Sequence, residues 1–171
     1  MTKILICGAN GRMGREAVIA INADPNLALV GVSLREDNLS EKIKQHKPDV
    51  VLDLTTPEVV YKNTLTIIEH DMRPVIGTSG LNATQIEHLQ QLCAQKKLGG
   101  IIAPNFSLGV LLMIKMAALA AAYLPHAEII ESHHSAKKDS PSGTAIKTAE
   151  TINAHRTQTI HVPDHSAKAR G

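Results

Sequence analysis

The sequence ILICGANGRMG, at residues 4–14, joins a run of four apolar residues to a loop that contains three glycines. The apolar run predicts a short buried β-strand, and residues 12–23 predict a helix that ends before Pro25. Glycine at positions 8, 11 and 14 permits a tight turn, close approach of the backbone to a pyrophosphate and close packing of helix on strand. The amides at the start of the helix would then face the negative charge. This unit predicts a doubly wound α/β fold with a dinucleotide site; a glycine-rich turn without a ligand is the alternative.

The same alternation of strand and helix continues through the first two thirds of the chain. Near-continuous apolar strands suit a parallel sheet that is covered by helices on both faces. Pro57 suits the first turn of a helix, and Asn82 and Gly99 are the expected caps of a later one. We therefore expect a Rossmann-like dinucleotide-binding domain over residues 1–107. Its expected strands are residues 4–7, 28–34, 49–54, 74–77 and 100–103, and its expected helices are residues 12–23, 41–46, 57–70 and 82–97.

The sequence changes character after this domain. Residues 108–124 are almost wholly apolar but include Lys115, and they fall just short of a membrane span. We therefore expect a buried helix over residues 108–125 that links two units. Within residues 126–171, an alternating pattern at 127–133 predicts a strand, 144–155 predict a helix, and 156–171 are polar. Since a lone strand and helix cannot form a stable domain, this region predicts only the start of a smaller α+β substrate domain.

The composition limits the classes of partner. The chain has 171 residues, a net charge of +2 and only 2% aromatic residues. This balance argues against nucleic-acid binding, which relies on a clustered basic face or on aromatic stacking platforms. Cys7 and Cys93 have no CxxC partner, so neither a disulfide framework nor a zinc site is supported. Because no signal-peptide pattern is present, we expect a reduced, cytoplasmic protein that does not enter a membrane.

The cofactor candidates follow expected strands, at the edge where open α/β sheets bind ligands. An acid is expected after the second strand for the ribose hydroxyls of NAD, but Leu34 takes that position. Arg35 could pair with a 2′-phosphate, which favours NADPH, although a solvated arginine is the alternative and Glu36 could serve NADH. The remaining candidates are Gly8, Ala9, Asn10, Gly11, Arg12 and Met13 in the first loop, Gly77, Thr78 and Ser79 after the fourth strand, and Ala103, Pro104, Asn105 and Phe106 after the fifth.

Ordinary strand-end turns are a serious alternative for the last two groups. Asp53 and Thr55, after the third strand, could also line a site, but such residues more often form a helix-capping turn.

The segment ESHHSAKKDSPSGTA, at residues 131–145, concentrates histidines and lysines directly after the last expected strand. His133 and Lys137 could face one pocket, where such a pair can supply protons. His134 could reach the same ligand. A zinc site is poorly supported, because adjacent histidines rarely share a metal and no third ligand has suitable spacing.

The same segment ends in a turn that opens a helix. Ser142, Gly143 and Thr144 would offer backbone amides and a hydroxyl to a carboxylate. The alternatives are a polar surface loop and a simple helix cap.

Taken in order, these motifs resemble the 4-hydroxy-tetrahydrodipicolinate reductase family of lysine and diaminopimelate synthesis. The last motif is highly specific to that family, whereas the glycine loop is not. The matching stretches are GANGRMG at 8–14, DLTTP at 53–57, GTSG at 77–80, APNFSLGV at 103–110 and ESHHSAKKDSPSGTA at 131–145. The resemblance implies reduction of a cyclic dicarboxylate with NADPH or NADH and without a metal.

The resemblance also implies residue roles. His133 and Lys137 would be the acid/base and proton-donor pair. His134, Gly143 and Thr144 would hold the substrate carboxylates, with Lys137 nearby. The residues expected to line the cofactor are 8–13, 77–79 and 103–106.

Two features depart from the family pattern. Leu34 replaces the acidic ribose-binding residue of many members, so both NADPH and NADH stay open. Members also continue beyond residues 169–171 with further strands, whose sheet forms a homotetramer, and with a final helix, so we expect a partial substrate domain here. The alternatives are another dinucleotide-dependent oxidoreductase of amino-acid metabolism and a dinucleotide-binding module without catalysis.

Overall fold

The computed structural model describes residues 1–103, 105–124, 126–133 and 140–157. The chain divides into two compact units, Met1–Phe106 and Ser107–Gly171. The first unit contains a sheet with four helices, and the described part of the second contains two helices.

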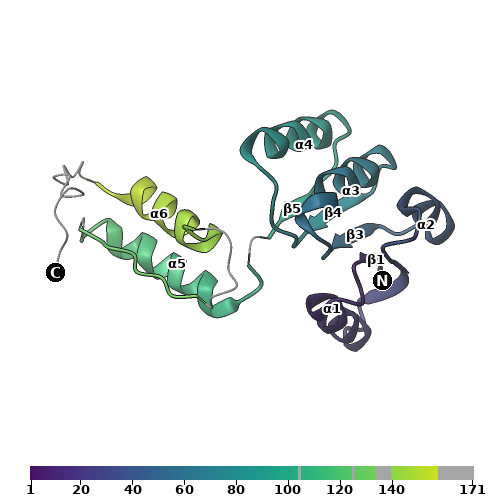
Figure 1. The fold of residues 1–171 in the computed structure, drawn as a ribbon, viewed down its shortest axis with the longest axis horizontal. Coiled ribbons are helices and arrows are strands. Elements are labelled where there is room, and N and C mark those ends of the chain that lie inside the picture. The colour runs from purple at the N-terminus through teal and green to yellow at the C-terminus, as the bar shows by residue number, and fades with distance from the viewer. Residues whose placement is uncertain (104, 125, 134–139, 158–171) are drawn as a thin grey trace. The chain divides into compact units, whose positions relative to one another are not determined.

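Five parallel strands form the sheet of the first unit (Figure 1). Their order is β2-β1-β3-β4-β5, and every neighbouring pair is parallel. The predicted doubly wound α/β fold is therefore confirmed, and each strand lies within one or two residues of its predicted bounds. The strands are β1 (Thr2–Cys7), β2 (Leu27–Ser33), β3 (Val50–Asp53), β4 (Arg73–Ile76) and β5 (Ile101–Ile102).

The strand order reverses beside β1. The chain leaves β1 to form β2 on one side and then returns to form β3 on the other side. Open α/β sheets bind ligands outside the carboxyl ends of their strands at such a reversal. The topology therefore points to the loops that follow β1, β2 and β3.

Four helices connect these strands, as the sequence predicts. They are α1 (Arg12–Ala23), α2 (Leu39–His46), α3 (Pro57–Glu69) and α4 (Ala83–Gln95). Helix α2 begins two residues before its predicted start because Asn38 caps it. The Asn38 side chain accepts hydrogen bonds from the amides of Ser40 and Glu41.

The two predicted caps of α4 have different outcomes. Asn82 is confirmed as the N-cap, in a reciprocal pair with Gln85. The prediction of Gly99 as the C-terminal cap is wrong, because α4 ends at Gln95 and Lys96 is its C-cap. Lys97, with φ of 54°, adopts the left-handed conformation that glycine usually supplies after a helix.

Alternate residues of β1 supply two separate hydrophobic clusters. Leu5 and Cys7 pack with Ile43 of α2 and Ile67 of α3. On the opposite face, Ile4 and Ile6 pack with Ala9 and with Ile21 of α1. Figure 1 shows α1 and α3 on opposite sides of the strands. Covering both faces explains why the strand is apolar at every one of these positions.

In the second unit, α5 (Leu108–Ala121) packs beside α6 (Gly143–His155) (Figure 1). The prediction that the apolar helix is buried is wrong for the described residues. Only Ala118 and Ala121 of α5 are buried, while Leu108 is 70% and Leu119 is 68% exposed. The reason is that α6 covers a single side of α5 within the described part of this unit.

The strand predicted at residues 127–133 is also wrong. These residues are exposed and form neither strand nor helix. An extended segment becomes a strand only when a neighbour completes its hydrogen-bond ladder, and the described residues of this unit contain no such neighbour. Across the described ranges, no helix is long and apolar enough to cross a membrane.

Candidate functional site

A pocket of about 540 Å³ opens at the carboxyl ends of β1, β2 and β3, entirely within the first unit. Its walls come from the loops that follow these strands and from the first turns of α3. They include Gly8, Gly11, Leu34, Arg35, Thr55 and Asn63. The pocket therefore lies at the reversal of strand order, which is where the topology predicts a ligand.

The glycine loop brings backbone close to backbone beside this pocket. Gly8 has φ of +82°, and a Cβ atom there would lie 2.5 Å from the carbonyl oxygen of Leu54. A Cβ atom on Gly14 would collide with the carbonyl oxygen of Gly8. Both positions therefore require glycine, for conformation at Gly8 and for helix packing at Gly14.

Helix α1 begins in this loop without a side-chain cap and without an acid in its first turn. The first amides of the helix therefore have no side-chain acceptor from the N-cap residue. They lie at the positive end of the helix dipole, which favours an anion. Gly11, the N-cap residue, lines the pocket and adds no side-chain atoms to it. These features fit the pyrophosphate of a dinucleotide.

The other predicted residues of this loop divide between core and surface. Ala9 is buried in the cluster beneath α1. Asn10, Arg12 and Met13 are exposed at the start of the helix. In this loop only Gly8 and Gly11 lie in the pocket wall.

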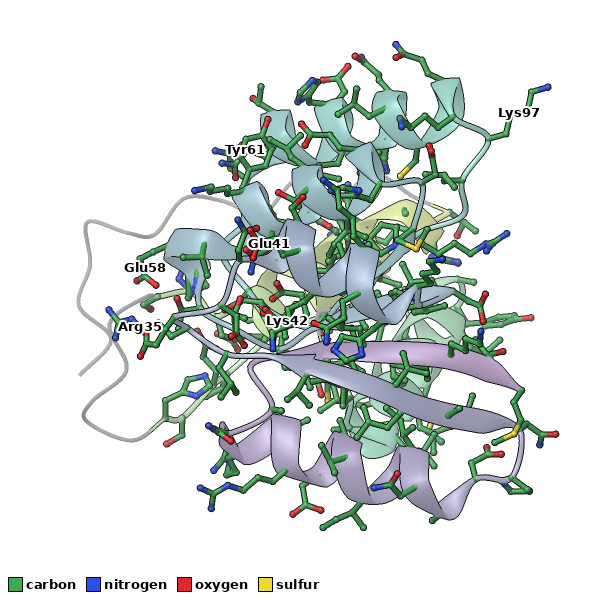
Figure 2. All side chains as sticks on the ribbon, turned by 90° about the vertical axis from the view of Figure 1, so that its right-hand side faces the viewer. Arg35, Glu41, Lys42, Glu58, Tyr61 and Lys97 are labelled. Carbon is green, nitrogen blue, oxygen red and sulfur yellow. The ribbon has the colours of Figure 1, made fainter. Side chains whose placement is uncertain are left out.

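The loop after β2 forms a closed turn at the pocket rim. The amide of Leu34 donates to the Asp37 carboxylate at 2.8 Å, and the amide of Asp37 donates to the Leu34 carbonyl at 3.2 Å. Lys42 lies 3.6 Å from the same carboxylate. Leu34, Arg35 and Asp37 all line the pocket. In Figure 2, Arg35 and Glu58, another wall residue, lie at the same end of the first unit, far from Lys97.

Asp37 was missed by the sequence reasoning, which sought the acid at position 34 or 36. The signal was present, because an Asp side chain in a turn often accepts from a backbone amide three residues earlier.

Beneath the pocket, Asp53 is a fully buried carboxylate at the end of β3. Thr55, Asn63 and Thr78 donate side-chain hydrogen bonds to it, at 2.7, 2.8 and 2.6 Å. Burial, and secondly the charge of Asp53, raise the pKa of the neighbouring Cys7 thiol, so Cys7 stays protonated. Sequence reasoning named Asp53 and Thr55 as possible liners but missed Asn63, which lies in the second turn of α3.

The loops after β4 and β5 meet at the same edge. A Cβ atom on Gly77 would collide with the Phe106 ring, so glycine here admits the aromatic side chain. The Ala103 amide donates to the Ile76 carbonyl at 2.8 Å. Thr78 is buried and Ser79 is exposed. Asn105 is partly buried, and Pro104 lies outside the described residues.

In the second unit, a carboxylate joins His133 to the start of α6. Glu131 lies 2.9 Å from Nε2 of His133 and accepts a 2.9 Å hydrogen bond from the Ser142 amide. Hydrogen bonds from the Ser142 side chain and amide, and then from His133, lower the pKa of Glu131 to about 2. Ser142 also caps α6, since its hydroxyl accepts from the Ala145 amide at 3.1 Å. Ser142 is therefore the N-cap of α6, a carboxylate-binding role for this turn stays a prediction, and Glu131 was not foreseen.

Of the remaining predicted residues of this segment, the structure describes two and leaves two undescribed. Gly143 and Thr144 form the first turn of α6, as predicted. His134 and Lys137 lie outside the described residues. Across the described ranges, no three His, Cys, Asp or Glu side chains are grouped so that they could hold a metal ion.

Comparison with known proteins identifies the family of the chain. A family model described as dihydrodipicolinate reductase, N-terminus, matches residues 2–106, and one described as dihydrodipicolinate reductase, C-terminus, matches residues 109–170. The 4-hydroxy-tetrahydrodipicolinate reductase of Legionella pneumophila (strain Lens) is 51% identical over 155 residues, which cover 91% of this chain and 64% of that relative. The reductase of the same name from Coxiella burnetii (strain RSA 493 / Nine Mile phase I) is 49% identical over 168 residues, covering 98% and 70%.

Solved structures give the same result. A dipicolinate-bound dihydrodipicolinate reductase from Paenisporosarcina sp. TG-14 matches with a TM-score of 0.80 and 41% identity, over 96% of this chain and 71% of that one. GenD2 from gentamicin A biosynthesis, in complex with NAD, matches with a TM-score of 0.60 at 15% identity, which shows a likeness of fold alone. The chain spans 64% of the length of the Legionella relative. Since two family models together match nearly all of its residues, the chain belongs to the dihydrodipicolinate reductase family.

Proposed function

We propose that this protein reduces 4-hydroxy-tetrahydrodipicolinate with NADPH or NADH, in lysine and diaminopimelate synthesis. The observation that carries the proposal is the pocket at the strand reversal. There, Gly8 and Gly14 leave the backbone without side chains beside the start of α1, which has no side-chain cap. The chain also belongs to this reductase family.

A cytoplasmic location belongs to the same proposal. Light scattering tests the homotetramer that the family resemblance implies.

In this proposal the first unit holds the cofactor. The amides that open α1 bind its pyrophosphate, and Leu34 and Arg35 bind its adenine ribose. The loops over residues 77–79 and 103–106 bind its nicotinamide half. When bound, the nicotinamide supplies a hydride to the substrate.

The second unit provides the groups that bind and protonate the substrate. His133 and Lys137 are the acid/base and proton-donor pair. His134, Gly143 and Thr144 hold the two carboxylates through charge and through amides at the start of α6, while Ser142 caps that helix and bonds to Glu131. Glu131, at 2.9 Å from Nε2 of His133, supports this role because the contact holds the imidazole ring in place.

The test is oxidation of NADPH by the purified chain, with the dicarboxylate generated in situ. Lys137→Ala should lower turnover by at least about 100-fold, the usual size of a general-acid contribution. Lys138→Ala makes the same charge change one residue away and should retain turnover. Equal rates for the two variants would remove Lys137 from the mechanism.

Cofactor choice is part of the proposal, and Arg35 supports a preference for NADPH. The one acid that follows β2 in the pocket wall, Asp37, already bonds to the Leu34 amide and lies beside Lys42. Arg35→Ala should therefore weaken NADPH binding about tenfold and leave NADH binding within about twofold. Arg73→Ala, at the opposite ends of the strands, is the matched control. Tighter binding of NADH than of NADPH by the wild-type chain would contradict this choice.

A dinucleotide-binding module without catalysis is the second candidate. The pocket is lined wholly by the first unit, so cofactor binding does not require a residue of the second. Calorimetric binding of NADPH without turnover would favour this candidate over the reductase.

A further inference from the structure

Asp53 gathers hydrogen bonds from three separate elements although no solvent reaches it. One of its oxygens accepts from the Thr55 amide at 3.1 Å, the Thr55 hydroxyl at 2.7 Å and the Thr78 hydroxyl at 2.6 Å. The other accepts from the Asn63 amide group at 2.8 Å. A buried carboxylate is tolerated when donors surround it in this way. The network joins the ends of β3 and β4 to α3.

These bonds decide which polar atoms remain for a ligand. A hydroxyl has one proton, and the Thr55 hydroxyl donates its proton to Asp53. Its oxygen can therefore only accept from a ligand. Asn63 gives one of its amide protons to the same carboxylate, which fixes the orientation of its carbonyl oxygen. Thr55 and Asn63 both line the pocket. Between them, Thr55 and Asn63 thus offer two acceptor oxygens and one remaining amide proton, which is a bias towards acceptors.

The strand order decides which half of a dinucleotide meets that wall. With the pyrophosphate at the start of α1 and the adenine ribose at the end of β2, the other half extends beyond β1 towards β3 and β4. Nicotinamide ribose hydroxyls and the carboxamide NH₂ group are hydrogen-bond donors, whereas phosphate oxygens only accept. The acceptor oxygens of Thr55 and Asn63 therefore complement the nicotinamide ribose hydroxyls and the carboxamide NH₂ group, and they disfavour phosphate oxygens.

We propose that Asp53 is a positioning residue for the nicotinamide half of the cofactor. Its carboxylate orients the Thr55 hydroxyl and the Asn63 amide so that they accept hydrogen bonds from that half. The Asp53 carboxylate also anchors the Gly77-Thr78-Ser79 loop, because it accepts a hydrogen bond from the Thr78 hydroxyl. The inference rests on the proposed dinucleotide function and adds a residue that does not itself line the pocket.

The experiment compares calorimetric binding of NADPH and of adenosine 2′,5′-bisphosphate, which lacks the nicotinamide half. Asp53→Asn should weaken NADPH binding at least about tenfold and change binding of the bisphosphate less than about twofold. Thr55→Val should show the same selective loss, and Thr55→Ser, which keeps the hydroxyl, should recover at least about threefold. Thr64→Val is the matched control, since Thr64 is a buried threonine whose hydroxyl donates to the Val60 carbonyl of the same helix.

The outcomes separate a positioning role from a structural one. Equal losses for both ligands, with a lower unfolding temperature, would make Asp53 a structural residue and overturn the inference. If Asp53→Asn does not fold, Thr55→Val and Thr55→Ser decide: wild-type NADPH binding by Thr55→Val overturns the inference. Failure of the wild-type chain to bind NADPH would contradict the proposed function itself, and the inference with it.

Discussion

Gly8 is one of the two positions in the glycine loop that require glycine. Its φ of +82° disfavours any L-residue, and its Cβ would lie 2.5 Å from the Leu54 carbonyl oxygen. Gly8→Ala should therefore lower the free energy of unfolding by about 3 kcal/mol, measured by urea denaturation. Such a loss is a large part of the stability of a small domain.

Gly11→Ala is the control for this prediction, because the nearest atom to its Cβ would be 3.4 Å away and its φ is −69°. We expect it to lose less than about 1 kcal/mol of stability. Equal losses in the two variants would contradict the conformational argument.

The Glu131 carboxyl should titrate far below its ordinary range. Because hydrogen bonds from Ser142 and His133 lower its folded pKa to about 2, from 4.5, its stabilising effect is complete above about pH 4.5. That effect is lost as the pH falls from about 4.5 towards 2. Carbon-13 NMR of the carboxyl should find a midpoint near 2 in the wild-type chain.

Ser142→Ala removes the largest cause of this shift and should raise the Glu131 pKa towards 4.5. Glu131→Gln is the assignment control, since the low-pH titration must disappear. A midpoint near 4.5 in the wild-type chain would contradict the Glu131–Ser142 contact.

At the scale of the element, the start of α4 depends on its capping box. Asn82 and Gln85 exchange side-chain and backbone hydrogen bonds at 2.9 and 3.0 Å. Asn82→Ala should therefore cost about 1 kcal/mol in the free energy of unfolding. The measurement is urea denaturation, followed by circular dichroism.

Thr56→Ala is the matched control, because Thr56 is the N-cap of α3 but makes no side-chain capping bond. Its cost should stay within about 0.5 kcal/mol. A cost for Thr56→Ala as large as that for Asn82→Ala would show that the capping bonds do not set helix stability here.

Elements with a complete local signal were predicted well, and those without one were not. Helix α1 was predicted to the residue, since an apolar stripe and Pro25 define both of its ends. The strand expected at residues 127–133 has the right alternation but lacks a partner among the described residues. Helix α5 shows the same limit, because an apolar sequence cannot reveal which sides of a helix will be covered.

At the scale of the whole molecule, the two units should respond separately to the cofactor. The pocket lies within Met1–Phe106, so a dinucleotide adds stability to that unit alone. In calorimetric unfolding, NADPH at 100 times its Kd should stabilise the first unit by about 2.7 kcal/mol and raise one transition. The transition of the second unit should stay at its original temperature.

Adenosine 2′,5′-bisphosphate provides the control, since it should raise the same transition by a smaller amount. A shift of both transitions by NADPH would contradict binding within a single unit. A single cooperative transition that moves as a whole would contradict independent unfolding of the units.

The amino-acid sequence is enough to predict the order of elements in the first unit, the glycine loop and the family. These signals are local, because apolar periodicity and the conformational freedom of glycine act over a few neighbouring residues. The fold alone reveals that Asp53 collects donors from Asn63 and from Thr78, which is 25 residues away, and that Asp37 is the acid that follows β2 in the pocket wall. Such contacts depend on which strand ends the sheet order brings together, and no short stretch of sequence encodes that order.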